Sequence, residues 1–128
     1  MKDANELELV FAVMTKDRPD GFLALMDPVL NSYRKRILDF LTQNRLPAIF
    51  ENKTWVEDGG LISYGANYAE AHQRAATLMD KILKGAKPAD LPVEQPTKFE
   101  LVINLKTAKQ MGLTIPQSVL FRADKVIK

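Results

Sequence analysis

Two short apolar segments flank a stretch with helical spacing, and this arrangement limits the fold of the 128-residue chain more than any other feature. Phe22–Met26 and Leu46–Phe50 each have the length and composition of a buried strand. Between them, Asp27-Pro28 is typical of a helix start, and apolar residues recur at helical spacing up to Asn44, which predicts a helix over about residues 28–43. Strands joined by such a crossover pair in parallel as a right-handed βαβ unit. The sequence therefore predicts an α/β fold.

The N-terminal and central segments add two further helices and an extended piece. Asp3 and Glu6 have the spacing of a capping box ahead of an apolar stripe, which predicts a first helix. After the break at Gly59-Gly60, the residues up to Tyr64 form a brief extended segment. Asn67 with Glu70 opens another helix, which ends at Gly85. The helix over residues 67–84 is the most clearly marked in the chain.

The C-terminal third begins with a proline-rich connector, because Pro88, Pro92 and Pro96 favour extended backbone and argue against a helix there. A strand follows at Phe99–Ile103. Asn104 is placed to cap a short helix that Gly112 ends, and from Pro116 to Ile127 the spacing of apolar residues predicts a last helical stretch.

Composition excludes several classes of function. The 18 basic and 16 acidic residues are interspersed, so the chain offers no positive run for nucleic acid. With no cysteine and with His72 as the single histidine, the sequence holds no thiol nucleophile and no recognisable metal site. It also lacks a phosphate-binding glycine loop and a serine nucleophile elbow. We therefore expect no catalytic residue, no cofactor and no metal.

Binding residues are expected beyond the carboxyl ends of the strands, where open α/β sheets hold their ligands. Each candidate also has a structural explanation: Asp27 can cap the following helix, the carboxylates around Trp55 can be solvated in a loop, and Tyr64 can pack. The ligand-contact candidates are Asp27, Asn31, Glu51, Asp58, Ser63 and Tyr64.

Five segments together resemble the C-terminal portion of a family of ABC-transporter substrate-binding proteins; they are Leu46–Phe50, Glu57–Gly65, Ala75–Gly85, Lys87–Pro96 and Phe99–Lys109. The string from Lys84-Gly85 through Glu94 and on into Ile103–Ala108 is the most specific part, whereas the first forty residues match only in pattern. The resemblance implies a three-layer, mostly parallel sheet with flanking helices, like the second lobe plus hinge of a type I periplasmic binding protein. It also implies a small-molecule solute, with amino acid-like compounds among the candidates, and an ABC permease as partner.

By the same resemblance, residues 1–64 form part of the second lobe and a hinge crossing. Residues 65–86 form a helix that docks on a first lobe, which this sequence lacks, and residues 87–128 form the connector, a return strand and C-terminal helices. Family members of this kind are periplasmic, while the absence of a signal peptide from the chain as written leaves the cytoplasm open.

The functional expectation is a solute-binding component of an ABC importer, present as a truncated C-terminal fragment that captures its ligand only together with the absent lobe. The apolar stripe of the 67–84 helix would then be uncovered, so we expect a homo-oligomer formed through this helix. The alternatives are a small cytoplasmic α/β enzyme that uses Glu57 or Asp58 as a base, and an inactive fragment that only oligomerises.

Overall fold

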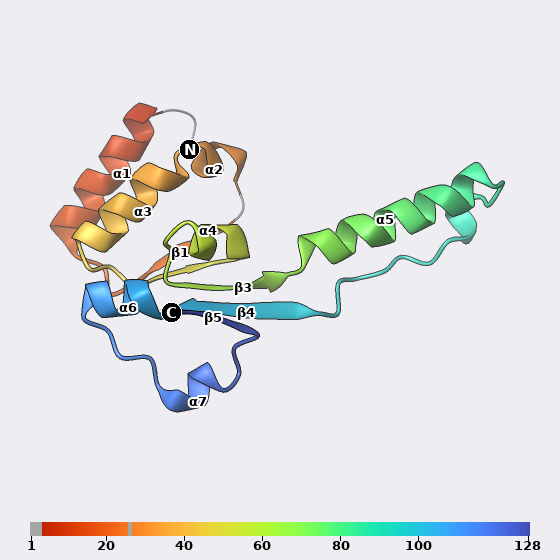
Figure 1. The fold of residues 1–128 in the computed structure, drawn as a ribbon. Coiled ribbons are helices and arrows are strands. Elements are labelled where there is room, and N and C mark those ends of the chain that lie inside the picture. Colours follow the sequence, from red (N-terminus) through yellow and green to blue (C-terminus); the bar gives the residue numbers. More distant parts are fainter. Residues whose placement is uncertain (1–3, 26) are drawn as a thin grey trace. The chain divides into compact units, whose positions relative to one another are not determined.

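The computed structural model describes residues 4–25 and 27–128, and in it the two apolar segments become neighbouring parallel strands (Figure 1). β1 (Phe22–Ala24) pairs in parallel with β2 (Ala48–Phe50), and β2 pairs in parallel with β3 (Ile62–Ala66). The sheet continues through β4 (Phe99–Asn104) to β5 (Lys125–Ile127), which are again parallel. The predicted α/β class with a mostly parallel sheet is therefore confirmed.

One pair of strands departs from the parallel arrangement. The amide of Asn104, at the end of β4, donates to the carbonyl of Leu61, just before β3, over 2.9 Å. Because the end of β4 lies beside the beginning of β3, these two strands run in opposite directions and the five-stranded sheet is mixed. The chain thus leaves this sheet along β3 and returns along β4.

Three helices lie where the sequence places them. They are α1 (Ala4–Asp17), α5 (Tyr68–Leu83) and α6 (Leu105–Met111). The side chains of Asn67 and Asn104 cap α5 and α6 as expected, since each accepts a bond from an amide of the first turn, and Gly112 ends α6 in the left-handed region with φ 73°. Asp3 and Met26, expected at a helix cap and at a strand end, lie outside the described residues.

The crossover between β1 and β2 contains two helices where the sequence predicts one. α2 (Pro28–Ser32) ends at Tyr33, and α3 (Arg34–Gln43) begins directly after it. Tyr33 has φ −101° and ψ 13°, outside the helical region, and it serves as the C-cap of α2 and the N-cap of α3. The apolar spacing continues across this break, so periodicity alone does not reveal it.

Three smaller predictions were wrong. The expected loop around Trp55 contains α4 (Lys53–Glu57), which Asn52 caps through a 2.8 Å bond from the Thr54 amide. The connector holds a short 3-10 helix, Pro88–Asp90, since proline is tolerated in a first turn. The last predicted helix is limited to α7 (Gln117–Leu120), and Val126 and Ile127 belong to β5 because they pair with β4.

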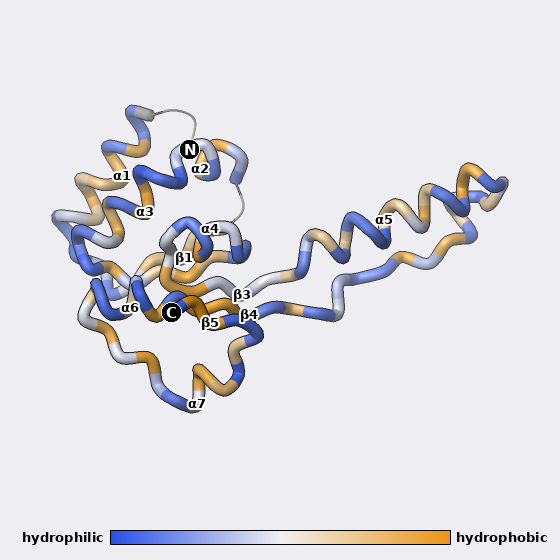
Figure 2. Tube along the Cα trace, in the orientation of Figure 1, coloured by the Kyte–Doolittle hydropathy of each residue, from blue (hydrophilic) through white to orange (hydrophobic). Residues whose placement is uncertain are grey.

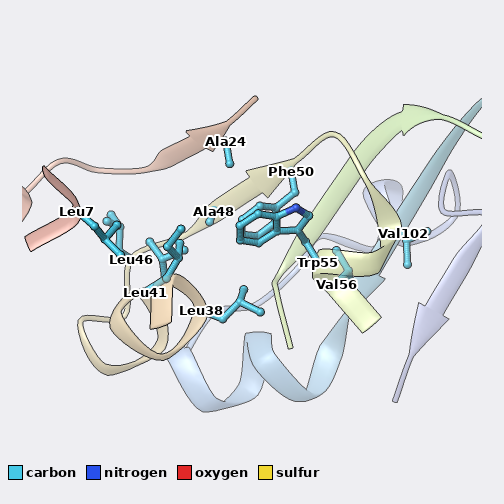
Figure 3. Packing of buried hydrophobic residues seen from close by; sticks show 11 residues of the cluster. Leu7, Ala24, Leu38, Leu41, Leu46, Ala48, Phe50, Trp55, Val56 and Val102 are labelled. Atoms are coloured by element: carbon cyan, nitrogen blue, oxygen red, sulfur yellow. The ribbon is translucent and has the colours of Figure 1, made fainter. Parts of the chain in front are cut away.

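The main core lies between the sheet and the helices α1 and α3 (Figure 3). Trp55 on α4 is buried there, and its ring stacks on that of Phe50 with centroids 4.8 Å apart and planes 10° from parallel. Figure 3 shows this pair among the apolar side chains that the helices and strands contribute. The core residues include Leu7, Ala24, Ile37, Leu38, Leu41, Leu46, Ala48, Phe50, Trp55, Val56 and Val102.

Two arginines end helices in the left-handed backbone region. Asn44 is the C-cap of α3, as predicted, and Arg45 follows it with φ 51°; Arg18 follows α1 with φ 46°. This conformation is unfavourable for a residue with a Cβ, and helix ends of this kind usually carry glycine. Both turns therefore hold a small strain.

The chain divides into two compact units. The residues up to Gly65, together with Glu100–Lys128, form the sheet unit, and Ala66–Phe99 form the second, which consists of α5 and the connector. Within the second unit, the Arg74 guanidinium donates two hydrogen bonds to the Glu94 carboxylate. The hydrogen bond from Arg74 lowers the pKa of Glu94, against a smaller opposing effect of desolvation. This pair fastens the connector to α5.

No helix among the described residues is both long and apolar enough to cross a bilayer.

Candidate ligand-binding edge of the sheet

The carboxyl ends of β1, β2 and β3 meet at one edge of the sheet, because the three strands run parallel. Asp27 lies just beyond β1 and Glu51 just beyond β2. In register, Phe50 lies opposite Ser63, so Glu51 and Tyr64 come next to each other along the two strands. The fold thus brings three of the predicted candidates to the edge where ligands of such sheets bind.

Asp27 caps α2, as its position before Pro28 predicts. Its Oδ1 accepts bonds from the amides of Val29 and Leu30 at 2.8 Å and 2.9 Å. Both bonds use the same carboxylate oxygen, and Oδ2 has no hydrogen-bond partner among the described residues. The half-buried carboxylate can therefore cap its helix and still accept a bond from a ligand.

Glu51 is held against β3 by a close approach of the two backbones. A Cβ added to Gly65 would lie 1.8 Å from the carbonyl oxygen of Glu51, a distance that no side chain can accept. Only glycine allows β3 to pass so close to the end of β2. Gly65 therefore fixes where the half-buried Glu51 leaves the sheet.

Asn31 and Asp58 are joined by a residue that the sequence did not single out. Nη1 of Arg34 donates to Oδ1 of Asn31 over 2.8 Å, and Nε of Arg34 lies 2.6 Å from Oδ2 of Asp58. The three side chains form a polar cluster at the beginning of α3. Arg34 lies in the first turn of α3 because the helix breaks at Tyr33, and the continuous apolar spacing of the sequence does not reveal this break.

Ser63 and Tyr64 point to opposite faces of the sheet, since side chains alternate along a strand. The Tyr64 side chain is exposed, with 57% of its surface accessible. Ser63 is 1% exposed, and its hydroxyl has no hydrogen-bond partner among the described residues. A solute at the surface can meet Tyr64 directly, whereas the Ser63 hydroxyl is a buried polar group in the layer beneath.

The loop carboxylates considered as an enzyme's acid and base are engaged in ion pairs that hold α4. Glu57 accepts a bond from Lys125 at 2.8 Å, and Asp58 is paired with Arg34 as described above. A third pair joins Lys53 to Glu100 over 3.2 Å. These contacts tie α4 to α3, β4 and β5. The structure therefore gives Glu57 and Asp58 a structural role.

Residues 4–25 and 27–128 contain no group of three or more carboxylate or histidine side chains arranged to bind a metal. His72 is exposed on α5, and its Nδ1 lies 2.6 Å from the carbonyl oxygen of Tyr68 in the preceding turn. One ring nitrogen of His72 thus has its hydrogen-bond partner within α5 itself.

Residues 1–127 match the model of a family described as ABC transporter substrate binding protein. The chain belongs to this family. Solved structures of similar proteins support this family assignment. A conserved domain protein from Vibrio cholerae O1 biovar El Tor is 27% identical, with a TM-score of 0.88, and the match covers 98% of this chain and 42% of that one.

Two further structures are similar. An ABC domain from Streptococcus pneumoniae, solved in complex with L-Trp, is 31% identical with a TM-score of 0.88, and the match covers 99% of this chain and 43% of that one. CD0873, a substrate-binding protein with adhesive properties from Clostridium difficile, was solved in a ligand-free, open form. It shares the fold at 22% identity with a TM-score of 0.69, covering 100% of this chain and 42% of that one. No curated protein matches the chain.

The substrate-binding protein thus spans less than half the length of the solved structures it matches. Its family is one of substrate-binding proteins. The predicted fold class is confirmed by these neighbours as well as by the sheet topology.

Proposed function

We propose that this substrate-binding chain holds a small solute at the carboxyl edge of β1–β3 on behalf of an ABC importer. The observation that carries the proposal is the arrangement of Asp27, Glu51 and Tyr64 at the ends of three parallel strands. Two carboxylates and an aromatic ring at one sheet edge can bind a cation and pack against an apolar group.

The edge suits an amino acid-like solute. In this proposal the ammonium group binds Asp27 through Oδ2 and Glu51 through its carboxylate, and an apolar or aromatic side chain lies on Tyr64. The carboxylate of the solute binds Arg34, whose remaining guanidinium N–H groups can donate while Asn31 and Asp58 hold its plane in position. Ser63 lies beneath this contact layer. The L-Trp bound to the Streptococcus pneumoniae relative supports a test with amino acids.

We further propose that residues 1–64 and the return strand form most of one jaw of a two-jaw clamp. The match to only 42–43% of the solved relatives supports this, since in those proteins the rest of the chain can supply the opposing jaw. Ligand contacts from both jaws favour the closed state, so one jaw alone should bind weakly. Delivery to an ABC permease places the complete clamp outside the cytoplasmic membrane.

Isothermal titration calorimetry with L-tryptophan and other amino acids tests the clamp. The 128-residue chain alone should bind no tighter than about 1 mM, which corresponds to about 4 kcal/mol of binding free energy. Micromolar binding by the chain alone would contradict the need for a second jaw while leaving solute binding intact.

A hybrid protein separates the two parts of the proposal. In it, this chain replaces the matching part of the Streptococcus pneumoniae relative, and the hybrid should bind an amino acid at micromolar concentration or below. Arg34→Met in the hybrid should weaken binding about 10- to 100-fold, because it removes a charged hydrogen bond to the solute. Lys35→Met, an exposed neighbour, is the matched control. A folded hybrid that binds no amino acid would contradict the proposed site.

A further inference from the structure

Two buried polar residues at the beginning of α6 bind the end of α4. The hydrophobic second half of β4 leads into α6 (Figure 2), and there Asn104 and Thr107 are only 5% and 3% exposed. Nδ2 of Asn104 donates to the carbonyl of Val56 over 3.2 Å. The hydroxyl of Thr107 donates to the carbonyl of Gly59 over 2.9 Å. We name residues 56–59 the α4 turn; its backbone is thus held from α6 at both ends.

Asp58 lies between these two anchored carbonyls, and its carboxylate faces the polar cluster of the ligand-binding edge. Oδ2 of Asp58 lies 2.6 Å from Nε of Arg34. The preceding residue, Glu57, is bound by Lys125 of β5 over 2.8 Å. Three side chains of the C-terminal segment therefore fix the α4 turn, and a shift of this turn would move the Asp58 carboxylate away from Arg34.

Arg34 needs a partner that is itself held in place. Its side chain has many rotamers, and an ion pair that is partly exposed to solvent restricts them only weakly. Nη1 of the guanidinium also donates to Oδ1 of Asn31 over 2.8 Å. A planar group held on two sides presents its remaining N–H groups in one direction, provided that Asp58 does not move.

We propose that Asn104 and Thr107 are positioning residues of the solute site. They fix the α4 turn, the turn fixes Asp58, and Asp58 orients Arg34 toward the carboxylate of the solute. This inference rests on the proposed function, in which Arg34 binds that carboxylate. Asn104 and Thr107 act through other residues, since both are almost fully buried, and all of these contacts lie within the sheet unit.

The Nε–Hε NMR signal of Arg34 in the ¹⁵N-labelled chain tests the positioning without any solute. In weakly acidic solution, Asp58→Ala gives the Hε exchange rate of the unpaired guanidinium, which should be about two- to fivefold faster than in the unmodified chain. Thr107→Val keeps the shape of the side chain and removes the hydroxyl, so it should produce most of this increase. Thr107→Ser restores the hydroxyl and should return the rate to that of the unmodified chain.

Two further variants separate positioning from a general loss of stability. Ile103→Val is the matched control, because it removes a buried methyl group next to Asn104 and no hydrogen bond, and it should leave the Arg34 exchange rate unchanged. Asn104→Ser keeps an oxygen that can cap α6 and loses the amide donor, so it should act like Thr107→Val. An unchanged rate in both Thr107→Val and Asn104→Ser would overturn the positioning role, as would an equal increase in Ile103→Val.

NMR titration with L-tryptophan and L-tryptophanamide tests the link to the solute, because the amide lacks the carboxylate that Arg34 binds. Below saturation, the slope of an amide shift against concentration is inversely proportional to the dissociation constant. Thr107→Val should lower this slope about two- to fivefold for L-tryptophan and less than about 1.5-fold for L-tryptophanamide. Equal losses for both compounds would contradict action through Arg34. No binding of L-tryptophan by the unmodified chain, with the Arg34 exchange effect intact, would contradict the solute site and not the positioning of Arg34.

Discussion

Replacing Gly65 with alanine should separate β3 from β2 at the ligand-binding edge. The added Cβ would lie 1.8 Å from the Glu51 carbonyl oxygen and 2.8 Å from its carbonyl carbon, whereas Cβ contacts below 3.0 Å are essentially never seen. The obstacle is backbone, which cannot rotate away as a side chain can. The two strand ends must therefore move apart by more than 1 Å.

The cost follows from what that movement breaks. Parting the strands by this distance should disrupt two or three backbone hydrogen bonds, each worth about 1 kcal/mol net, and loosen the packing around Phe50. We expect Gly65→Ala to lower the free energy of unfolding by about 3 kcal/mol. Urea denaturation followed by circular dichroism measures this loss, with the slope of the transition checked for unchanged two-state behaviour.

Gly21→Ala is the matched control. A Cβ at Gly21, just before β1, would lie 3.6 Å from the carbonyl oxygen of Pro47, an ordinary contact at the other end of β2. This variant should change the free energy of unfolding by less than about 0.5 kcal/mol. Equal stability of the Gly65→Ala and Gly21→Ala proteins would refute the reasoning about the close approach of the two strands.

Three further changes have expected outcomes. Trp55→Ala should lower the free energy of unfolding by about 3–5 kcal/mol in urea denaturation, because it empties a buried site stacked on Phe50, while Trp55→Phe should lose less. Arg45→Gly should raise it by about 1 kcal/mol, since the left-handed backbone at φ 51° favours glycine; an unchanged urea midpoint would argue against strain there. Pairing with Arg74 lowers the pKa of Glu94, so the pair stabilises the fold above pH 4.5 and this stabilisation is lost as the pH falls below that value. The amides of the connector should therefore be less protected from hydrogen exchange in acid. Glu94→Gln should remove this pH dependence.

Much of the fold could be predicted because local signals and tertiary packing agree. The Asp27-Pro28 helix start, the caps at Asn67 and Asn104 and the glycine at Gly112 all act within a few residues, and the structure keeps each of them. Two short apolar runs separated by a helix favour parallel pairing of the strands, and β1 and β2 pair in that way.

The failures share a physical cause, which is that long-range packing decided the outcome. Val126 and Ile127 have spacing that fits a helix or a strand, and pairing with β4 selects the strand. The segment around Trp55 was expected to be a loop, but packing of Trp55 on Phe50 stabilises a short helix there. Arg34 could not be recognised because its contact with Asp58 joins residues far apart in the chain.

The central claim is that the carboxyl ends of β1–β3 hold a solute, and NMR shift mapping tests it most directly. The ¹⁵N-labelled chain is titrated with L-tryptophan and the other readily soluble amino acids up to about 20 mM, which populates a complex even when its dissociation constant is about 10 mM. The account predicts that at least one of them shifts the amide signals of Asp27, Asn31, Glu51 and Tyr64, and leaves Gly21 and Leu46 at the opposite edge unchanged. Shifts centred on Gly21 and Leu46, or no shift with any amino acid, would contradict it.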